Sequence, residues 1–234
     1  MSHPSLAIVI PALNEESTLP QLIKSLDSLK PAEIIVISDF SQDRTAQVAR
    51  ELGATVLDLA DPLGAWGATQ AGLRYALAKN YPYIVTMDAD GQHLPSEIPK
   101  LIAHYEISKA NIVIGSCVER GSLLRHCAWH LLRHLSGLPI SDLTSGFRLY
   151  DRKAQRVAAA SRASLLDYQD IGLLLQAGSA GLSISEAPAK MLPREKGASR
   201  VFRNWRLVAY YMAYSGLLGF SKRRIQAVSG RARW

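Results

Sequence analysis

The sequence predicts an α/β fold in which a mostly parallel sheet is flanked by helices. The chain has 234 residues, enough for one domain with a sizeable core, and 48% of them are hydrophobic. Short β-rich runs alternate with helical stretches through its first half. The first run, LAIVI (6–10), is continuously apolar, as in a parallel strand that is buried on both faces. This alternation indicates βαβ units and a parallel sheet.

The individual elements follow this rhythm along the chain. After strand 6–10, leucines and an isoleucine at helical spacing predict a helix over about 16–29. The further elements are strand 33–38, helix 43–52, strand 54–59, helix 67–79, strand 83–87, helix 95–108 and strand 111–116. Ligands of such sheets bind at the carboxyl ends of the strands. Three polar segments follow such ends, PALNEE (11–16), DFSQD (39–43) and DADGQH (88–93), so the sequence predicts a site there.

The sequence argues against two classes of nucleotide-binding enzyme and against secretion. PALNEE lacks the glycine-rich turn of a dinucleotide fold, and no phosphate-binding GxxxxGK[ST] sequence occurs in the chain. Cys117 and Cys127 are too few for a disulfide framework and indicate a reducing compartment. The first residues lack the pattern of a signal peptide. We therefore expect neither a nicotinamide enzyme nor a P-loop enzyme. We expect a cytoplasmic protein.

The segment DADGQH places Asp88 and Asp90 directly after an apolar strand. Residues two apart in an extended chain point to the same side, so both carboxylates could hold a hard divalent cation, with open positions for phosphate oxygens. The carbonyl oxygen of Gln92 could add a ligand. A solvated turn explains the same letters, because Asp and Gly are ordinary turn residues. The motif by itself leaves both interpretations open.

Four segments together resemble the inverting glycosyltransferases of family 2, which have the GT-A fold. These are PALNEE, the aspartate after the second strand, DADGQH and TSGFRLYDRKA (144–154). Within the family, the chain looks most like the polyprenyl-phosphate sugar synthases, the group of dolichyl-phosphate mannose synthase. The resemblance covers roughly residues 5–200. It implies a UDP- or GDP-sugar donor, Mg²⁺ or Mn²⁺, and transfer with inversion at the anomeric carbon.

The resemblance also assigns roles around the nucleotide. Pro11, Ala12, Leu13 and Glu15 would line it, with Glu15 accepting hydrogen bonds from the ribose hydroxyls, and Asp39 would face the base. An acid at a helix N-terminus, favoured by the helix dipole, is the alternative explanation of Glu15. The resemblance therefore makes the first two loops the nucleotide site.

The same resemblance assigns binding of the metal and the donor phosphates to the third loop, DADGQH (88–93). Asp88, Asp90 and Gln92 would hold them, and Asp88 would also contact the nucleotide. A bound metal can neutralise charge that develops on the leaving diphosphate. His93 is interpreted as a turn or packing residue and is not assigned a catalytic role.

The later motif is placed near the donor sugar and the acceptor. Ser145, Gly146 and Arg148 form this region by resemblance. Arg148 could contact phosphate, or it could pair with Asp151 in a surface contact. Both interpretations of Arg148 stay open.

Catalytic assignments rest on two later segments. In LPREKGAS (192–199), Arg194 and Lys196 would contact the diphosphate or an acceptor phosphate, and Gly197 would let the loop close; a solvated basic loop is the alternative. In LLDYQDIGLLLQA (165–177), Asp167 and Asp170 are candidate bases, and Asp170 aligns best with the family's acid. Helix capping explains Asp170 equally well. An acceptor that is already a phosphate monoester needs no strong base.

Three positions depart from the family pattern. Relatives commonly show D-D-G-S-x-D where this chain has SDFSQD (38–43), so Ser38 replaces an acid and Phe40 a glycine that tolerates unusual backbone angles. In the next loop, Trp66 stands in a region where relatives carry Asn and closely spaced glycines. These departures leave the base and sugar preference open.

The net charge of +7 belongs to the C-terminal tail, because residues 194–234 carry +9 and residues 1–193 carry −2. Within 203–224, about 14 mostly apolar residues lie between basic flanks. A helix of that length spans ~21 Å, short of the ~30 Å hydrocarbon core. Aromatic residues and basic flanks favour an interfacial helix on an anionic leaflet. A core-packing helix with a frayed basic end is the alternative.

The sequence therefore predicts a GT-A glycosyltransferase domain over residues 1–200 and a basic amphipathic helix and tail over 201–234. The expected acceptor is a polyprenyl phosphate at the inner, cytoplasmic face of the membrane. A family 2 enzyme with a glycan or small-metabolite acceptor, and a non-catalytic nucleotide-sugar-binding or membrane-scaffold relative, are the alternatives. No recognition-helix, zinc or RNA-binding signature accompanies the basic tail, so nucleic acid is not an expected partner.

Overall fold

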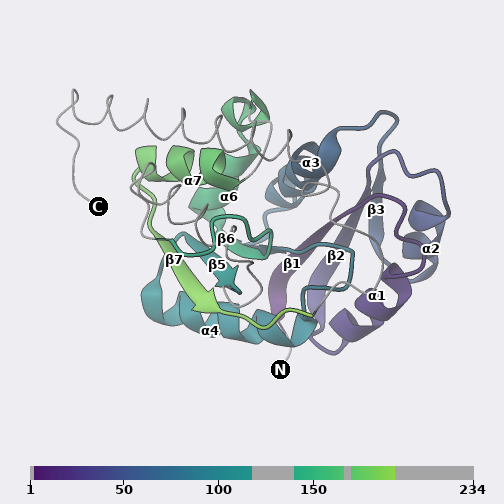
Figure 1. The fold of residues 1–234 in the computed structure, drawn as a ribbon, viewed down its shortest axis with the longest axis horizontal. Coiled ribbons are helices and arrows are strands. Elements are labelled where there is room, and N and C mark those ends of the chain that lie inside the picture. The colour runs from purple at the N-terminus through teal and green to yellow at the C-terminus, as the bar shows by residue number, and fades with distance from the viewer. Residues whose placement is uncertain (1–2, 118–139, 166–169, 193–234) are drawn as a thin grey trace, which may run out of the picture.

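A sheet of seven strands forms the centre of the computed structural model, which describes residues 3–117, 140–165 and 170–192 (Figure 1). The strands are β1 (His3–Ala12), β2 (Pro31–Ser38), β3 (Thr55–Asp58), β4 (Tyr83–Thr86), β5 (Ile112–Ser116), β6 (Arg148–Asp151) and β7 (Ile184–Pro188). Their order across the sheet is β3-β2-β1-β4-β6-β5-β7. β6 runs antiparallel to β4 and β5, and the other neighbours are parallel. The prediction of a mostly parallel sheet flanked by helices is confirmed.

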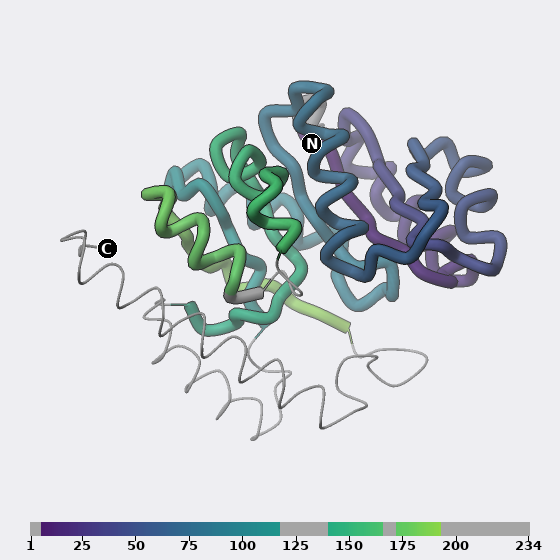
Figure 2. The backbone as a smooth tube through the Cα atoms, turned by 90° about the horizontal axis from the view of Figure 1, so that it is seen from above, coloured from purple at the N-terminus to yellow at the C-terminus, as the bar shows by residue number. Residues whose placement is uncertain are grey.

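Helices cover both faces of the sheet. One face carries α1 (Leu19–Asp27), α2 (Thr45–Glu51) and α4 (Ile98–Ser108), which follows the 3-10 turn η1 (Pro95–Glu97). The other carries α3 (Gly64–Ala78), α6 (Arg152–Ala159) and α7 (Asp170–Ser179), with the 3-10 turn η3 (Ser161–Leu165). Figure 2 looks onto this second face, where α6 packs against both α3 and α7.

The hydrophobic core has two parts, one on each face of the sheet. In β1, Ala7 and Val9 belong to the cluster beneath α3, α6 and α7, whereas Ile8 and Ile10 belong to the cluster beneath α1, α2 and α4. Successive strand residues point to opposite faces, so a strand covered on both sides must be apolar throughout. The continuous run LAIVI therefore has its explanation in the three-layer architecture.

The bounds of several helices differ from those expected. The helix expected over 16–29 begins at Leu19, because the Glu15 carbonyl accepts from the Thr18 and Leu19 amides in a preceding turn. The helix expected over 43–52 begins at Thr45, whose amide bonds to the Asp43 carboxylate. The helix expected over 67–79 begins earlier, at Gly64. Local side-chain and turn bonds accompany the starts at Leu19 and Thr45, and hydrophobic spacing does not report such bonds.

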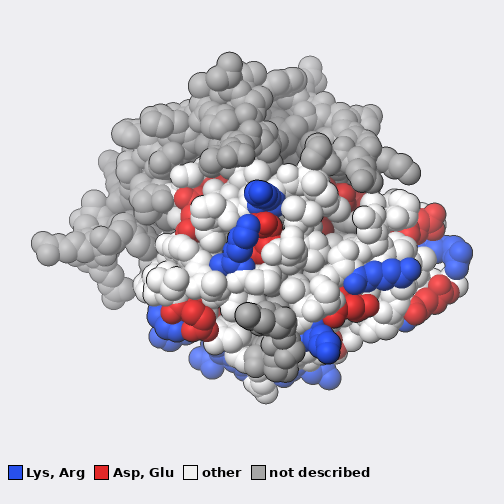
Figure 3. Space-filling view, turned by 90° about the horizontal axis from the view of Figure 1, so that it is seen from below, with Lys and Arg blue, Asp and Glu red and all other residues white. Residues whose placement is uncertain are grey.

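None of the helices within the described ranges is long and apolar enough to cross a membrane. The proposed interfacial segment 203–224 lies outside those ranges, and so does the boundary expected near residue 200. On the side of the molecule shown in Figure 3, basic and acidic side chains are interspersed over the described surface.

Candidate active site at the carboxyl edge of the sheet

The carboxyl ends of β1, β2, β4, β5 and β7 meet at one edge of the sheet, and antiparallel β6 begins there. This topology places most of the predicted site residues on one edge. They are Pro11, Ala12, Leu13, Glu15, Asp39, Asp88, Asp90, Gln92, Ser145, Gly146 and Arg148. Pro11 and Ala12 are the last residues of β1 itself. Arg194, Lys196, Gly197 and Asp167 lie outside the described residues, and Asp170 is the first residue of α7.

The loops that follow β1 and β2 are joined by reciprocal hydrogen bonds. The Asn14 amide donates to Oγ of Ser41 at 3.2 Å, and the Gln42 amide donates to Oδ1 of Asn14 at 2.8 Å. The Glu16 amide donates to Oδ2 of Asp43 at 3.2 Å. The first two polar segments of the edge are therefore one connected unit.

Asp43 is the acid at the centre of this unit. Partial burial acts to raise the pKa of its carboxyl, but hydrogen bonds from the Thr45 hydroxyl and amide and from the Glu16 amide outweigh burial and lower it. Its negative charge is therefore stabilised by the folded loops.

Glu15 contributes to the start of α1. Its Oε2 accepts from the Thr18 hydroxyl at 2.8 Å, and its amide donates to Oγ1 of Thr45 at 2.8 Å. Glu15 thus belongs to the turn before α1, and the first turn of the helix itself holds no acid. The ribose contact implied by the family resemblance stays a prediction.

Asp39 is almost fully buried at the end of β2, with 3% of its surface exposed. Its amide donates to the Ala12 carbonyl at 2.9 Å, and its Oδ1 accepts from the Leu63 amide at 2.7 Å. The next residue, Phe40, has a positive φ of 56°. The backbone of Phe40 thus has the left-handed conformation that a glycine would adopt without strain, at a cost of about 1–2 kcal/mol.

Trp66 does not belong to this edge. It is buried with 5% exposure in the core beneath α3, and its indole Nε1 donates to the Ala163 carbonyl at 2.7 Å. The departure from the family pattern at this position therefore has a packing role.

The DADGQH segment is a tight turn built on its own side chains. The Asp88 amide donates to Nδ1 of His93 at 2.9 Å, and the Gln92 amide donates to Oδ1 of Asp90 at 3.1 Å. Gly91, with φ of 77°, has the left-handed conformation that glycine adopts without strain. The Asp88 side chain is 47% exposed, so its carboxylate can reach a ligand.

His93 packs between the turn and the hydrophobic core. It is 1% exposed, and its ring stacks on that of Phe147 with centroids 5.2 Å apart and an angle of 21°. Phe147 in turn packs against Gly115, where an added Cβ would lie 2.4 Å from its Cδ1. The interpretation of His93 as a turn and packing residue is confirmed. Its bond to the Asp88 amide depends on the tertiary fold and had no signal in the sequence.

The residues of the motif SGFR (145–148) form buried hydrogen bonds with neighbouring segments. Oγ of Ser145 donates to the Gly115 carbonyl at 2.6 Å, and the Gly146 carbonyl accepts from Oγ1 of Thr86 at 2.7 Å. Arg148 is fully buried, and its NH2 group donates to the Leu143 carbonyl at 3.1 Å.

The interpretation that Arg148 pairs with Asp151 at the surface is wrong. Arg148 is buried, and Asp151 instead caps α6 by accepting from the Ala154 amide at 2.8 Å. The two residues are three apart on one strand, so their side chains point to opposite faces of the sheet. A phosphate contact by Arg148 stays a prediction.

The segment after β7 pairs with the DADGQH turn. Met191 and His93 form an antiparallel bridge, and the Leu192 amide donates to the Gln92 carbonyl at 2.9 Å. Nε2 of Gln92 donates to the Leu192 carbonyl at 3.4 Å. This pairing brings the chain to the two aspartates just before the basic stretch that contains Arg194.

The donor set of the turn fits a metal that is shared with a substrate. Within the described ranges, no group of three or more His, Cys, Asp or Glu side chains is arranged to hold a metal. Mg²⁺ is commonly bound by one or two carboxylates together with substrate phosphates. Asp88 and Asp90 match that pattern, because two carboxylates leave positions for phosphate oxygens.

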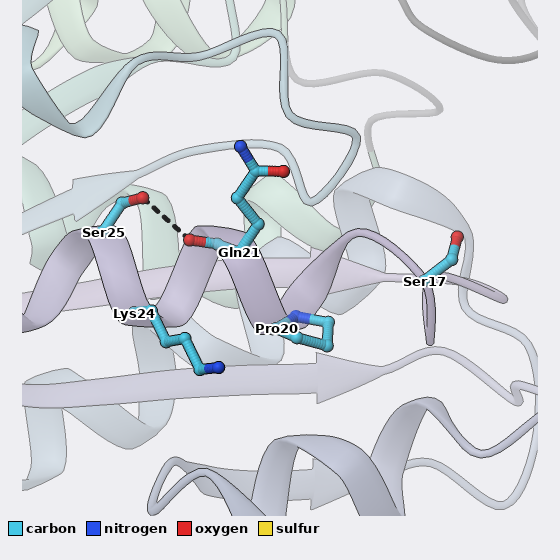
Figure 4. A pocket seen from close by; sticks show the side chains of 5 residues that line it. All are labelled: Ser17, Pro20, Gln21, Lys24 and Ser25. Carbon is cyan, nitrogen blue, oxygen red and sulfur yellow. Dashed lines mark hydrogen bonds between the residues drawn. The ribbon is translucent and has the colours of Figure 1, made fainter.

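A shallow surface hollow elsewhere does not involve these residues. It is lined by Ser17, Pro20, Gln21, Lys24 and Ser25, all from α1 and the turn before it (Figure 4). Oγ of Ser25 donates to the Gln21 carbonyl within the helix at 2.8 Å. None of the predicted site residues lines this hollow.

The fold and the joined loops at its edge define a GT-A glycosyltransferase. Residues 7–158 match the family model described as glycosyl transferase family 2, and the chain belongs to that family. The chain is 30% identical to a polyprenol monophosphomannose synthase of Mycolicibacterium smegmatis, over 91% of this chain and 87% of that protein. It is 29% identical to an undecaprenyl-phosphate mannosyltransferase of Micrococcus luteus, over 82% and 86%.

A solved structure supports the same fold. It is glucosyl-3-phosphoglycerate synthase from Mycobacterium tuberculosis in complex with Mn²⁺, UDP-glucose and phosphoglyceric acid. The TM-score is 0.67 at 21% identity, with 93% of this chain and 79% of that chain covered.

Proposed function

We propose that this glycosyltransferase moves a sugar from a UDP- or GDP-sugar to a polyprenyl phosphate, with inversion. The observation that carries this proposal is the pairing of Leu192 with Gln92, which joins the acidic turn to the chain leading into PREKGAS. Arg194 follows Leu192 by two positions in the sequence. Carboxylates for a metal and cations for phosphate would then meet around one diphosphate.

The chain's own residues have separable tasks in this reaction. Asp88 and Asp90 would hold Mg²⁺ or Mn²⁺, which supplies positive charge to the diphosphate oxygens when bound. Arg194 and Lys196 would contact the diphosphate or the acceptor phosphate, and Asp39 and Glu15 would bind the nucleoside. Gln92, whose amide nitrogen bonds to Leu192, would position the turn or present its carbonyl oxygen to the metal.

Bond changes in the reaction need no strong base. An oxygen of the acceptor phosphate forms the new bond to the anomeric carbon, and the bond from that carbon to the diphosphate oxygen breaks. The nucleoside diphosphate leaves with the electron pair. A phosphate monoester has a second pKa near 6, so its oxygen is already deprotonated near neutral pH. A base such as Asp170 is needed only for a hydroxyl acceptor.

The relatives' names support the choice of acceptor. Two of them act on polyprenol or undecaprenyl phosphate by name, and the chain covers more than four fifths of each. The segment 203–224 would bring the enzyme to such a lipid at the cytoplasmic face of the membrane, as a peripheral protein.

Calorimetric titration of the full chain with UDP and GDP, with and without Mn²⁺, tests the donor site. We expect Mn²⁺-dependent binding of one nucleotide that is lost in Asp90→Ala. Asp27→Ala is the matched control, because Asp27 is exposed at the far end of α1. A transfer assay with the matching nucleotide sugar and a polyprenyl phosphate in vesicles then tests the acceptor. Binding of neither nucleotide would refute the proposal, and transfer only to a hydroxyl acceptor would refute the lipid.

A further inference from the structure

A phenylalanine occupies a left-handed backbone conformation at the site edge. Phe40 has φ of 56°, and 44% of its surface is exposed. L-residues other than Asn and Asp rarely adopt this conformation, and it is held only where the surrounding structure fixes the backbone. Strained residues of this kind concentrate at ligand sites, so Phe40 calls for a functional explanation.

The backbone around Phe40 is fixed on both sides. Before it, the Asp39 amide donates to the Ala12 carbonyl at 2.9 Å. After it, the Gln42 amide donates to Oδ1 of Asn14 at 2.8 Å, and Nε2 of Gln42 donates to the Phe40 carbonyl at 3.2 Å. The loop cannot relax without breaking these bonds. The aromatic side chain is therefore kept at the surface, outside both core clusters.

Leu63 is a second exposed apolar residue at this edge, and its backbone binds the carboxylate of Asp39. Leu63 is 54% exposed, and its amide donates to Oδ1 of Asp39 at 2.7 Å. Gly67 makes room for it, because a Cβ there would lie 2.6 Å from Cβ of Leu63. Asp39 thus directly precedes one exposed apolar residue, Phe40, and is hydrogen-bonded to the backbone of another, Leu63, and neither of the two belongs to a core cluster.

We propose that Phe40 and Leu63 are the apolar walls of the nucleobase site and that Phe40 determines its affinity for the base. This inference rests on the proposed function. A nucleobase has flat apolar faces that stack on an aromatic ring, and uracil and guanine carry ring N–H groups that a carboxylate such as Asp39 accepts. The binding contribution of the ring accounts for an aromatic residue where glycine would be unstrained.

Titrations that separate the base from the diphosphate test the inference. Wild type, Phe40→Gly and Phe40→Leu are titrated as full chains with UDP, GDP and inorganic pyrophosphate in Mg²⁺. We expect Phe40→Gly to weaken the preferred nucleoside diphosphate by about 5- to 30-fold and Phe40→Leu by less, because stacking on an aromatic ring is lost. Pyrophosphate affinity should change by less than about twofold, because pyrophosphate has no base to stack.

Lys30→Gly is the matched control for the backbone change. Lys30 is exposed and has φ of 45°, but it precedes β2 at the opposite edge of the sheet. Both glycine variants should keep or raise the melting temperature, and only Phe40→Gly should lose nucleotide affinity. Unchanged nucleotide binding in Phe40→Gly, or equal losses for nucleotide and pyrophosphate, would overturn the inference while the proposed function stands. Absence of nucleotide binding by the wild type would remove both.

Discussion

The backbone N–H of Asp88 donates to Nδ1 of His93 across 2.9 Å, so an imidazole nitrogen fixes the start of the acidic turn. Accepting this bond requires an Nδ1 without a proton. Stacking on Phe147 holds the ring in place. The buried imidazole therefore holds the backbone of Asp88, a predicted metal ligand, and the turn depends on the core that packs against His93.

Replacing His93 should damage both stability and the metal-dependent site. His93→Ala removes a buried ring and the partner of the Asp88 amide, which we expect to lower the free energy of unfolding by about 2–3 kcal/mol. Nucleotide affinity in Mn²⁺ should fall at least tenfold at a temperature where the variant is folded, because the Asp88 carboxylate loses its orientation. Denaturant unfolding and calorimetry measure the two effects.

His104 provides the matched control for that variant. It lies on α4, and its Nε2 bonds to Oγ of Ser185 at 2.6 Å, away from the acidic turn. His104→Ala should lose stability without losing nucleotide affinity. Equal affinity losses in both variants would mean that His93 acts only through general stability.

Two glycines test whether the support of the turn is specific. Gly115→Ala would bring a Cβ within 2.4 Å of Phe147, and Gly72→Ala would bring one within 2.5 Å of Val9 in the core. Both should lower the free energy of unfolding by about 1–3 kcal/mol through overpacking. Only Gly115→Ala should also weaken nucleotide binding, because Phe147 carries the ring of His93. Similar affinities of the two variants would contradict the support role.

Asp43 should link loop stability to acid pH. Its pKa is lower in the folded protein than in the unfolded chain, so its contribution is present above the ordinary aspartate pKa near 4 and is lost as pH falls through the lower folded value. Asp43→Asn should lower stability at pH 7 by about 1 kcal/mol, since the carboxylate is partly solvated. Thermal unfolding between about pH 3 and pH 7 should show the difference from wild type shrinking in acid. Asp27→Asn, an exposed change of the same charge outside these loops, is the control variant.

The basic tail should mediate binding to anionic membranes. Replacing Lys222, Arg223 and Arg224 with alanine in the full chain should weaken binding to vesicles that contain anionic lipid by roughly 100-fold, because each charge contributes about 1 kcal/mol. The loss should diminish at high salt. Vesicle flotation measures the effect.

A control with the same change in charge separates the tail from net charge. Lys24, Lys30 and Lys153 are exposed cations of the described surface. Their replacement by alanine should leave vesicle binding within about twofold of wild type. A comparable loss in this control would mean that the overall charge, and not the tail, binds the membrane.

The antiparallel strand β6 shows the limit of reading the fold from the sequence. The alternation of strands and helices up to residue 116 was sufficient to predict a mostly parallel sheet and the edge that collects the loops. β6 has four residues, and its place between β4 and β5 comes from non-local pairing. The strand β7 likewise follows from its pairing with β5.

The candidate site also has features that the sequence predicted and features that only the structure showed. Asp39, Asp88 and Asp90 could be chosen from the sequence because polar residues after apolar strands converge at one edge. Of the two interpretations of Arg148, the surface pair with Asp151 was wrong, since a charged residue is usually exposed and only the packing of β6 reveals its burial. The strain at Phe40 and the exposure of Leu63 were also invisible before the loops were placed.

The sequence by itself determined the sheet-and-helix rhythm, the family and the loops that carry the acids, because periodicity and short motifs are local properties of the chain. Only the tertiary structure decided which of the residues at the site edge are buried, such as His93 and Arg148, and that the side chain of Asp88 is half-exposed. These features depend on contacts such as His93 with Phe147 and Leu192 with Gln92, which join residues far apart in sequence. Their energies come from burial and hydrogen bonds that exist only once the sheet has assembled.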